Sequence, residues 1–160
     1  GALYYNKDKI DWGEGRFLAA FNTPMQVTDE RYFDIRDALR CFDPYLEANR
    51  RTKNPVFHAS LNPAPEDRLT NDELRQIARE YMERMGYGAQ PCFVFLHEDI
   101  VSLRVGLDGR KLAHDFEARR SREILDALER HYGLRPAAEG DAKQTYDTLS
   151  KLDYTKSDFK

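Results

Sequence analysis

The sequence predicts an α+β domain with a central antiparallel sheet flanked by helices. Strand-like segments lie between amphipathic helices, but they lack the regular alternation of a parallel α/β fold. The 160 residues are enough for a single core, because domains usually contain about 100–200 residues. The composition, 41% hydrophobic and 33% charged, is typical of a globular chain and too polar for a membrane protein.

The first part of the chain contains a short apolar run, and a helix is predicted after it. The run covers residues 17–21, and Pro24 ends the segment that contains it. Thr28 or Asp29 is expected to cap the helix, in which apolar side chains recur at helical spacing at Tyr32, Ile35, Leu39 and Phe42. Residues 43–44, Asp-Pro, predict a break and a new short helix, because aspartate favours the N-cap and proline the first turn.

The second part predicts a strand and two helices. Residues 56–61 (VFHASL) form the expected strand, which the sequence NPAP at 62–65 ends. The next helix has a capping box from Thr70 to Glu73 and ends at Gly86, and its apolar stripe is Leu74, Ile77, Tyr81 and Met85. A last helix is expected over 115–132, with Gly133 as its stop. Residues 1–134 would then form the domain, and 135–160 an extended arm that leads into a further C-terminal region.

The segment 92–105 is too long for one strand. Its 14 residues include no glycine, proline or asparagine. At about 3.3 Å per residue they would extend about 46 Å, whereas a domain of this size has a radius of gyration of about 15 Å. Two strands joined by a turn would fit, but the usual turn residues are absent. We therefore expect a loop between Ile100 and Val101 that the printed sequence lacks, through omission or deletion.

Charge and cysteine content exclude several classes of protein. The net charge of −3 predicts no uniformly basic surface, so a nucleic-acid site would have to be a local patch. Cys41 and Cys92 have no metal-ligand spacing and cannot form a disulfide framework, so we expect small core residues and a reducing compartment. No apolar stretch approaches the ~20 residues of a transmembrane helix, and the first residues show no signal-peptide pattern.

Four segments in the middle of the chain carry a resemblance to a known family. They are RTKNPVFHASL at 51–61, PEDRLT at 65–70, YMERMGYG at 81–88 and FEARRS at 116–121. These segments resemble the relaxase/mobilisation nuclease family of plasmids and conjugative elements, most closely the mobilisation proteins of Bacteroides-type elements. The resemblance extends more weakly to ALYYN at 2–6 and KLDY at 151–154. It implies a relaxase-like nuclease domain over 1–134, with the His-hydrophobe-His endonuclease type of fold.

The resemblance also implies an active site in which a tyrosine acts beside a metal held by three histidines. Tyr5 best matches the tyrosine, and Tyr4 is the alternative; otherwise both are core or interface aromatics. The segment HED at 97–99 matches the family's His-x-Asp pattern, which makes His97 a metal ligand and Asp99 a catalytic group beside the metal. In the family a His-hydrophobe-His pair precedes an Ile-Val-Ser-like strand. That pair is absent here, at the same junction at which strand length predicts a gap. The implied cofactor is a divalent ion, Mg²⁺ or Mn²⁺.

Five residues are expected to contact DNA: His58, Arg51, Lys53, Arg119 and Arg120. Basic clusters bind phosphates in a salt-dependent and largely sequence-blind manner. The alternative for the arginines is a solvated surface with ion pairs to nearby glutamates. His58 could orient a phosphate or support the metal, and the alternative is a hydrogen-bonded histidine within the sheet.

The function that the resemblance implies is metal-assisted nicking of one DNA strand at a transfer origin through a tyrosyl-phosphodiester intermediate. The substrate would be single-stranded or locally melted origin DNA, the location the bacterial cytoplasm, and the partners accessory mobilisation proteins, without a membrane. A tyrosine hydroxyl has a pKa of about 10, so it needs activation before it attacks phosphorus. Two alternatives remain open. One is a homologue that binds origin DNA without cutting it, and the other is a protein-interaction module of a mobilisation complex.

Overall fold

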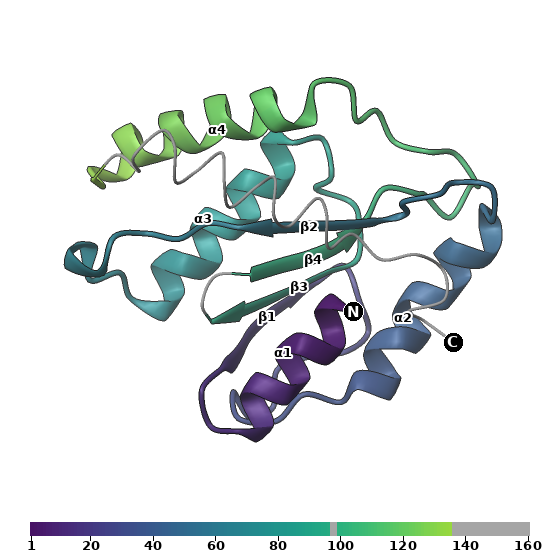
Figure 1. The fold of residues 1–160 in the computed structure, drawn as a ribbon, viewed down its shortest axis with the longest axis horizontal. Helices are drawn as coiled ribbons and strands as arrows, with labels where there is room; N and C mark the ends of the chain where they lie inside the picture. Colours follow the sequence, from purple (N-terminus) through teal and green to yellow (C-terminus); the bar gives the residue numbers. More distant parts are fainter. Residues whose placement is uncertain (97–98, 136–160) are drawn as a thin grey trace.

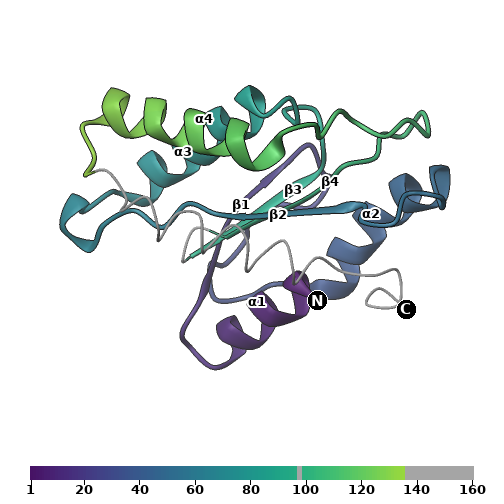
Figure 2. The ribbon, with the colours of Figure 1, turned by 45° about the horizontal axis from the view of Figure 1, so that its top comes forward.

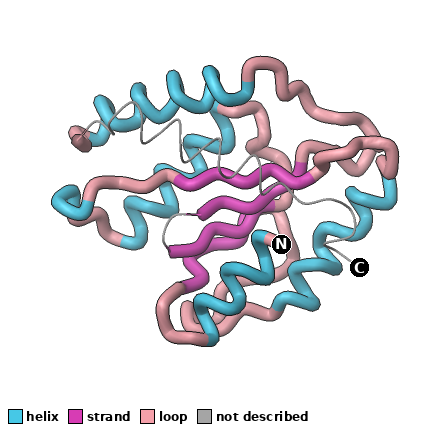
Figure 3. The backbone as a smooth tube through the Cα atoms, viewed as in Figure 1, coloured by secondary structure: helices cyan, strands magenta, loops and turns pink. Residues whose placement is uncertain are grey.

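The computed structural model describes residues 1–96 and 99–135 of the chain. A four-stranded antiparallel sheet lies at its centre, with the strand order β1-β3-β4-β2 (Figures 1 and 3). The elements in chain order are α1 (Ala2–Asp11), β1 (Arg16–Phe21), α2 (Ile35–Ala48), β2 (Val56–Ser60), the 3₁₀ helix η1 (Pro65–Asp67), α3 (Asn71–Arg84), β3 (Cys92–Leu96), β4 (Asp99–Leu103) and α4 (Glu117–Tyr132). This architecture confirms the predicted α+β class.

Helices cover both faces of the sheet, with α1 and α2 on one face and α3 and α4 on the other (Figure 2). The core under α1 and α2 is rich in aromatic rings, and the Phe33 ring lies 4.9 Å, centroid to centroid, from the rings of both Phe17 and Phe95. The core under α3 and α4 contains Tyr81 and Leu128, both fully buried. Successive strand residues therefore face different cores, as the period of two requires.

The helices α3 and α4 form as their sequences predict. The Thr70 hydroxyl accepts a hydrogen bond from the Glu73 backbone N–H at 3.1 Å, and the Glu73 carboxylate accepts one from the Thr70 N–H at 3.2 Å. This confirms the capping box. The second helix begins at Glu117 rather than at 115 and ends at Tyr132, where Gly133 adopts the left-handed conformation with φ of 66°.

The helix α2 corrects two predictions. Its N-cap is Asp34, whose carboxylate accepts a hydrogen bond from the Asp37 N–H at 3.1 Å, so Thr28 and Asp29 are not its caps. The helix also continues through Pro44 to Ala48, so the predicted break at 43–44 is wrong. Pro44 lies on the exposed side, where water can satisfy the carbonyl that its missing N–H leaves free. Packing of the buried side of α2 therefore outweighs the low helix propensity of proline.

The segment 92–105 contains two strands, as its length predicts, but the chain reverses at a different place. Phe95 pairs with Asp99, and Phe93 with Val101, so the reversal falls between Leu96 and Asp99. Ile100 and Val101 are consecutive residues within β4, and both also pair with β2. The chain therefore turns before Asp99 rather than at 100–101, and two strands of this length need no additional residues there. The loop expected between Ile100 and Val101 stays a prediction. The absence of the histidine pair is then the one remaining reason to expect missing residues at this junction.

The two ends of the chain differ in how far the structure tests the sequence predictions. The helix α1 was not predicted; its buried Leu3, Asn6 and Ile10 recur at helical spacing but within a polar stretch. The predicted C-terminal arm lies, apart from Arg135, outside the described residues. Across the part of the chain that the structure describes, every helix is too short or too polar to cross a bilayer.

Candidate functional site

A histidine and an aspartate meet at one end of the sheet. His58 lies in β2 and Asp99 in the neighbouring β4, where Val101 is the direct partner of His58 and Ser60 that of Asp99. His58 and Asp99 are thus diagonal neighbours on adjacent strands, and the His58 Nε2 lies 3.7 Å from the Asp99 Oδ2. Val101 belongs to the core beneath α1 and α2, so His58 and Asp99 lie on that face of the sheet. At 3.7 Å the contact is too long for a direct hydrogen bond and is electrostatic when the histidine is protonated.

The His58 ring is buried without a partner. Its side chain is 2% exposed, and neither ring nitrogen has a hydrogen-bond partner among residues 1–96 and 99–135. Leaving a buried polar group unpaired costs about 1–3 kcal/mol, and such groups are rare in native folds. The neighbouring Asp99 side chain is 14% exposed. The pair is thus the strongest candidate in the sheet for a ligand contact.

The described donors do not complete the metal site that the resemblance implies. No group of three or more histidine, cysteine, aspartate or glutamate side chains that could hold a metal occurs within the described residues. His58 and Asp99 offer two donors of suitable type. His97, the expected ligand, lies outside the described residues, and its assignment stays a prediction. A site with three imidazoles therefore does not fit the described part of this chain.

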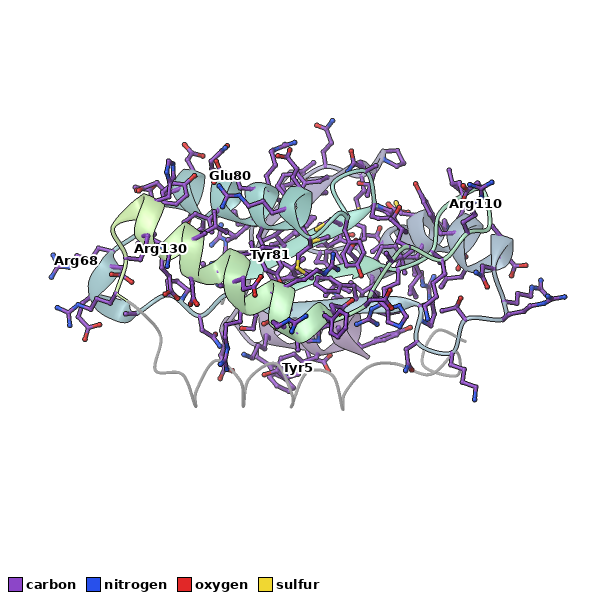
Figure 4. The ribbon with its side chains drawn as sticks, turned by 90° about the horizontal axis from the view of Figure 1, so that it is seen from above. Tyr5, Arg68, Glu80, Tyr81, Arg110 and Arg130 are labelled. Carbon is purple, nitrogen blue, oxygen red and sulfur yellow. The ribbon has the colours of Figure 1, made fainter. Side chains whose placement is uncertain are left out.

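Tyr4 and Tyr5 lie in α1, on the same side of the sheet as His58 and Asp99. Their exposed fractions are 43% and 51%, and neither hydroxyl is hydrogen-bonded to another described residue. The Lys9 ammonium lies 4.8 Å from the centroid of the Tyr5 ring, a cation–π contact. Figure 4 shows Tyr5 at the margin of the molecule, away from the central Tyr81. Both tyrosines are within reach of solvent, and no hydrogen bond joins either hydroxyl to His58 or Asp99 in the described part of the chain.

The predicted DNA contacts lie in different environments. Arg51 and Lys53 are exposed in the segment between α2 and β2, at the end of the sheet opposite to Asp99. Arg119 is exposed, and its guanidinium lies 4.5 Å from the centroid of the Phe116 ring. Arg120 is half-buried and donates to the Met85 carbonyl at 3.4 Å, while its Nε and Nη2 are buried without a hydrogen-bond partner in the described residues. Arg120 therefore points inward rather than toward solvent.

A buried charge network that sequence reasoning missed joins Arg104, the residue after β4, to α4. The Arg104 guanidinium donates to both carboxylate oxygens of Glu117, at 3.1 and 2.7 Å, and the Tyr87 hydroxyl donates to the same carboxylate at 2.7 Å. Burial raises the pKa of the Tyr87 phenol, and the hydrogen bond to Glu117 raises it further. The one signal in the sequence was an arginine within the apolar run VSLRV at 101–105. Its partner could not be identified, because only the fold brings Glu117 to it.

Comparison with known proteins adds a family assignment. Residues 20–134 match the family described as "Relaxase: MobA/VirD2-like, nuclease domain". The match begins within β1 and extends through α4, and thus includes His58 and Asp99, whereas the α1 tyrosines precede it. Neither the curated proteins nor the solved structures give a match. Because the matched segment makes up well over half of the chain, this protein belongs to the MobA/VirD2-like relaxase family.

Proposed function

We propose that the protein binds single-stranded or locally melted DNA at a transfer origin and nicks one strand through a tyrosyl-phosphodiester intermediate. The relaxase family supports a role in DNA mobilisation. The observation that carries the proposal further is the unpartnered, buried His58 beside Asp99, on the face that is covered by the helix with Tyr4 and Tyr5. Accessory mobilisation proteins and a cytoplasmic location belong to the same proposal.

In the proposed reaction the Tyr5 hydroxyl oxygen attacks the phosphorus of one phosphodiester. A bond from that oxygen to phosphorus forms, the bond from phosphorus to one deoxyribose oxygen breaks, and the phenol proton finally resides on the departing sugar hydroxyl. Asp99 would accept the proton during the attack, and His58 would hold a phosphate oxygen by a ring N–H. One phosphodiester replaces another, so the strand can be rejoined by the reverse reaction.

A divalent ion, Mg²⁺ or Mn²⁺, belongs to the proposal because relaxases generally use one. His97 would be one ligand, and the two further histidines would have to come from residues that the printed sequence does not contain. Such an ion would stabilise negative charge on the attacked phosphate. Since the described donors do not complete its site, the steps above are assigned to protein groups alone.

A second candidate function is a homologue that binds origin DNA without cutting it. Ile100 and Val101 are consecutive and paired on both sides, and the printed sequence has no histidine pair between them. Of the four histidines, His114 and His131 are exposed in or before α4 and far along the chain from His58. If the natural chain is continuous as printed, this second function is favoured.

The test is formation of a covalent adduct. The protein is incubated with Mg²⁺ or Mn²⁺ and a supercoiled plasmid that carries the DNA flanking its gene, and protein–DNA complexes that survive detergent are measured. We expect an adduct that Tyr5→Phe abolishes and Tyr4→Phe, the matched control, retains, with DNA binding intact in both. The opposite pattern would assign the reaction to Tyr4. Binding without any adduct under either metal would overturn the nicking proposal in favour of the second candidate.

A further inference from the structure

An open cleft of about 880 Å³ lies at the end of the sheet where β2 begins and β4 ends. One wall is the segment 47–54, which joins α2 to β2, and the other is formed by Arg104, Gly109, Lys111 and His114. Asp99 and Ser60 lie at the opposite end of the same strands. Figure 4 shows Arg110, from the second wall's loop, and Arg68 at opposite ends of the molecule. The cleft is therefore distinct from the His58–Asp99 pair.

The two walls are fastened to each other. The Asn49 side-chain amide donates to the Gly109 carbonyl at 3.1 Å, and the Arg104 guanidinium donates to the Asn54 carbonyl at 3.1 Å. Gly109 has a φ of 82°, and a Cβ built on it would come within 2.8 Å of the Ala48 carbonyl oxygen. Only glycine allows this close approach without strain. The cleft is thus a built feature rather than a gap between independent loops.

The charge of the cleft is positive and uncompensated. Two of its arginines are paired, Arg50 with Glu47 of the same wall and Arg104 with the buried Glu117. Arg51, Lys53 and Lys111 form no ion pair with any residue in the described part of the chain. The Lys111 ammonium lies 3.3 Å from the His114 Nε2, where the neutral imidazole can accept its hydrogen bond. Three cations from two walls thus face one cleft, in a protein whose net charge is −3.

An exposed aromatic ring follows the cleft directly in the chain. Phe116 comes two residues after His114, and it is 70% exposed. Its φ of 54° is unusual for a bulky residue, and such strained positions concentrate at functional sites. The Arg119 guanidinium lies 4.5 Å from the ring centroid and helps to hold the ring in place. A cationic groove next to an aromatic platform is the combination that binds single-stranded nucleic acid.

We propose that this cleft binds backbone phosphates of single-stranded DNA through Arg51, Lys53 and Lys111, while a neighbouring base stacks on Phe116. The inference rests on the proposed DNA-binding function and adds a second contact region at the far end of the sheet. Stacking requires a base outside a duplex, so the Phe116 ring favours single strands over double-stranded DNA. The cleft would recognise a phosphate group, which either the DNA backbone or free inorganic phosphate could supply.

The test measures the salt dependence of binding to a fluorescent single-stranded oligonucleotide. Each phosphate neutralised on a single strand contributes about 0.7 to the slope of log affinity against log salt. The triple variant Arg51→Gln, Lys53→Gln and Lys111→Gln should therefore reduce the slope by about 2. Arg40→Gln is the matched control, because Arg40 is exposed on α2, lies outside the cleft and pairs with Asp37. Its slope should match that of the wild-type protein.

The ring is tested separately with Phe116→Gly, which removes the side chain and relieves the positive φ, so the fold should be retained. Stacking of one base predicts a loss of affinity of about five- to 150-fold with little change in slope. Leu107→Ala is the control, since Leu107 is an exposed apolar residue of the same connection. It should bind like the wild-type protein.

Several outcomes would overturn the inference. The cleft assignment is wrong if the triple variant behaves like Arg40→Gln while the wild-type protein binds the oligonucleotide. If inorganic phosphate binding is lost in the triple variant but the oligonucleotide slope is unchanged, the cleft is a site for small anions and not for DNA. If the wild-type protein itself does not bind single-stranded DNA, the proposed function fails along with the inference.

Discussion

Replacing Arg104 by methionine should destabilise the protein severely, because it leaves a charge buried. The side chains of Arg104 and Glu117 are 7% and 8% exposed. The guanidinium makes two hydrogen bonds to the carboxylate and two more to the Asn54 and Val56 carbonyls. Arg104→Met would leave the Glu117 carboxylate with the Tyr87 hydroxyl as its remaining partner among those contacts. Breaking one side of a buried pair costs about 3–5 kcal/mol, a large part of the roughly 5–15 kcal/mol that stabilises a domain.

The double variant Arg104→Met with Glu117→Leu distinguishes charge burial from loss of packing. With both charges removed, the penalty for burying a carboxylate without its guanidinium partner disappears, so the double variant should be more stable than Arg104→Met alone. The measurement is urea unfolding at pH 7 followed by far-ultraviolet circular dichroism, analysed as a double-mutant cycle. The reasoning is refuted if Arg104→Met costs less than about 1 kcal/mol, or if the two single effects simply add.

Three further predictions concern stability. Thr70→Ala should lower the free energy of unfolding by about 1 kcal/mol in urea titrations, because it removes the N-cap of α3. Phe33→Ala should cost about 3–5 kcal/mol by the same measurement, since its ring is fully buried between two others. Burial raises the pKa of Tyr87 above its unfolded value of 10.0. The contribution of the protonated Tyr87 to the free energy of unfolding is therefore complete below pH 10 and is lost as the pH rises further. Tyr87→Phe should be less stable at pH 7, but its unfolding free energy should fall less steeply above pH 10, by up to about 1.4 kcal/mol per pH unit.

Local side-chain chemistry made some elements predictable and left others hidden. The start of α3 depends on Thr70 and Glu73, which are close in sequence and satisfy each other's backbone groups, so the sequence shows it. The continuation of α2 through Pro44 depends on the core against which its buried Phe42 packs, and no local pattern reveals that. The reversal before Asp99 has no usual turn residues. It is imposed by the pairing of β4 with strands on both sides.

The candidate site divides in the same way. His58 was recognised from a strand pattern and a family-like segment, and the structure adds that its ring is unpartnered and faces Asp99. The sequence indicated only one wall of the cleft. Arg51 and Lys53 are near neighbours in sequence, but Lys111 reaches them only through the antiparallel packing of β2 against β4. Long-range pairing thus decides which charges act together.

The register of β4 predicts on which face of the sheet an inserted histidine pair would lie. Val101 and Leu103 face the core beneath α1 and α2, and Ile100 faces the opposite core. If a segment ending in His-hydrophobe-His-Ile is inserted directly before Val101, its histidines stand two and four positions before Val101. By the period of two, both lie on the His58 face. We expect this insertion variant to bind Mn²⁺ in isothermal titration calorimetry, whereas the printed chain should bind it far more weakly.

A matched control uses the same inserted segment with one additional alanine before Val101. The slip by one residue turns both histidines to the face beneath α3 and α4, away from His58, without changing the number of imidazoles in the chain. This control should therefore lose the tight Mn²⁺ binding while it retains a folded spectrum. Equal binding by both variants would show that the inserted histidines hold the ion as a flexible loop, independent of the sheet. The His58 face would then have no part in positioning them, and the assignment of His58 as a supporting group would fall with it.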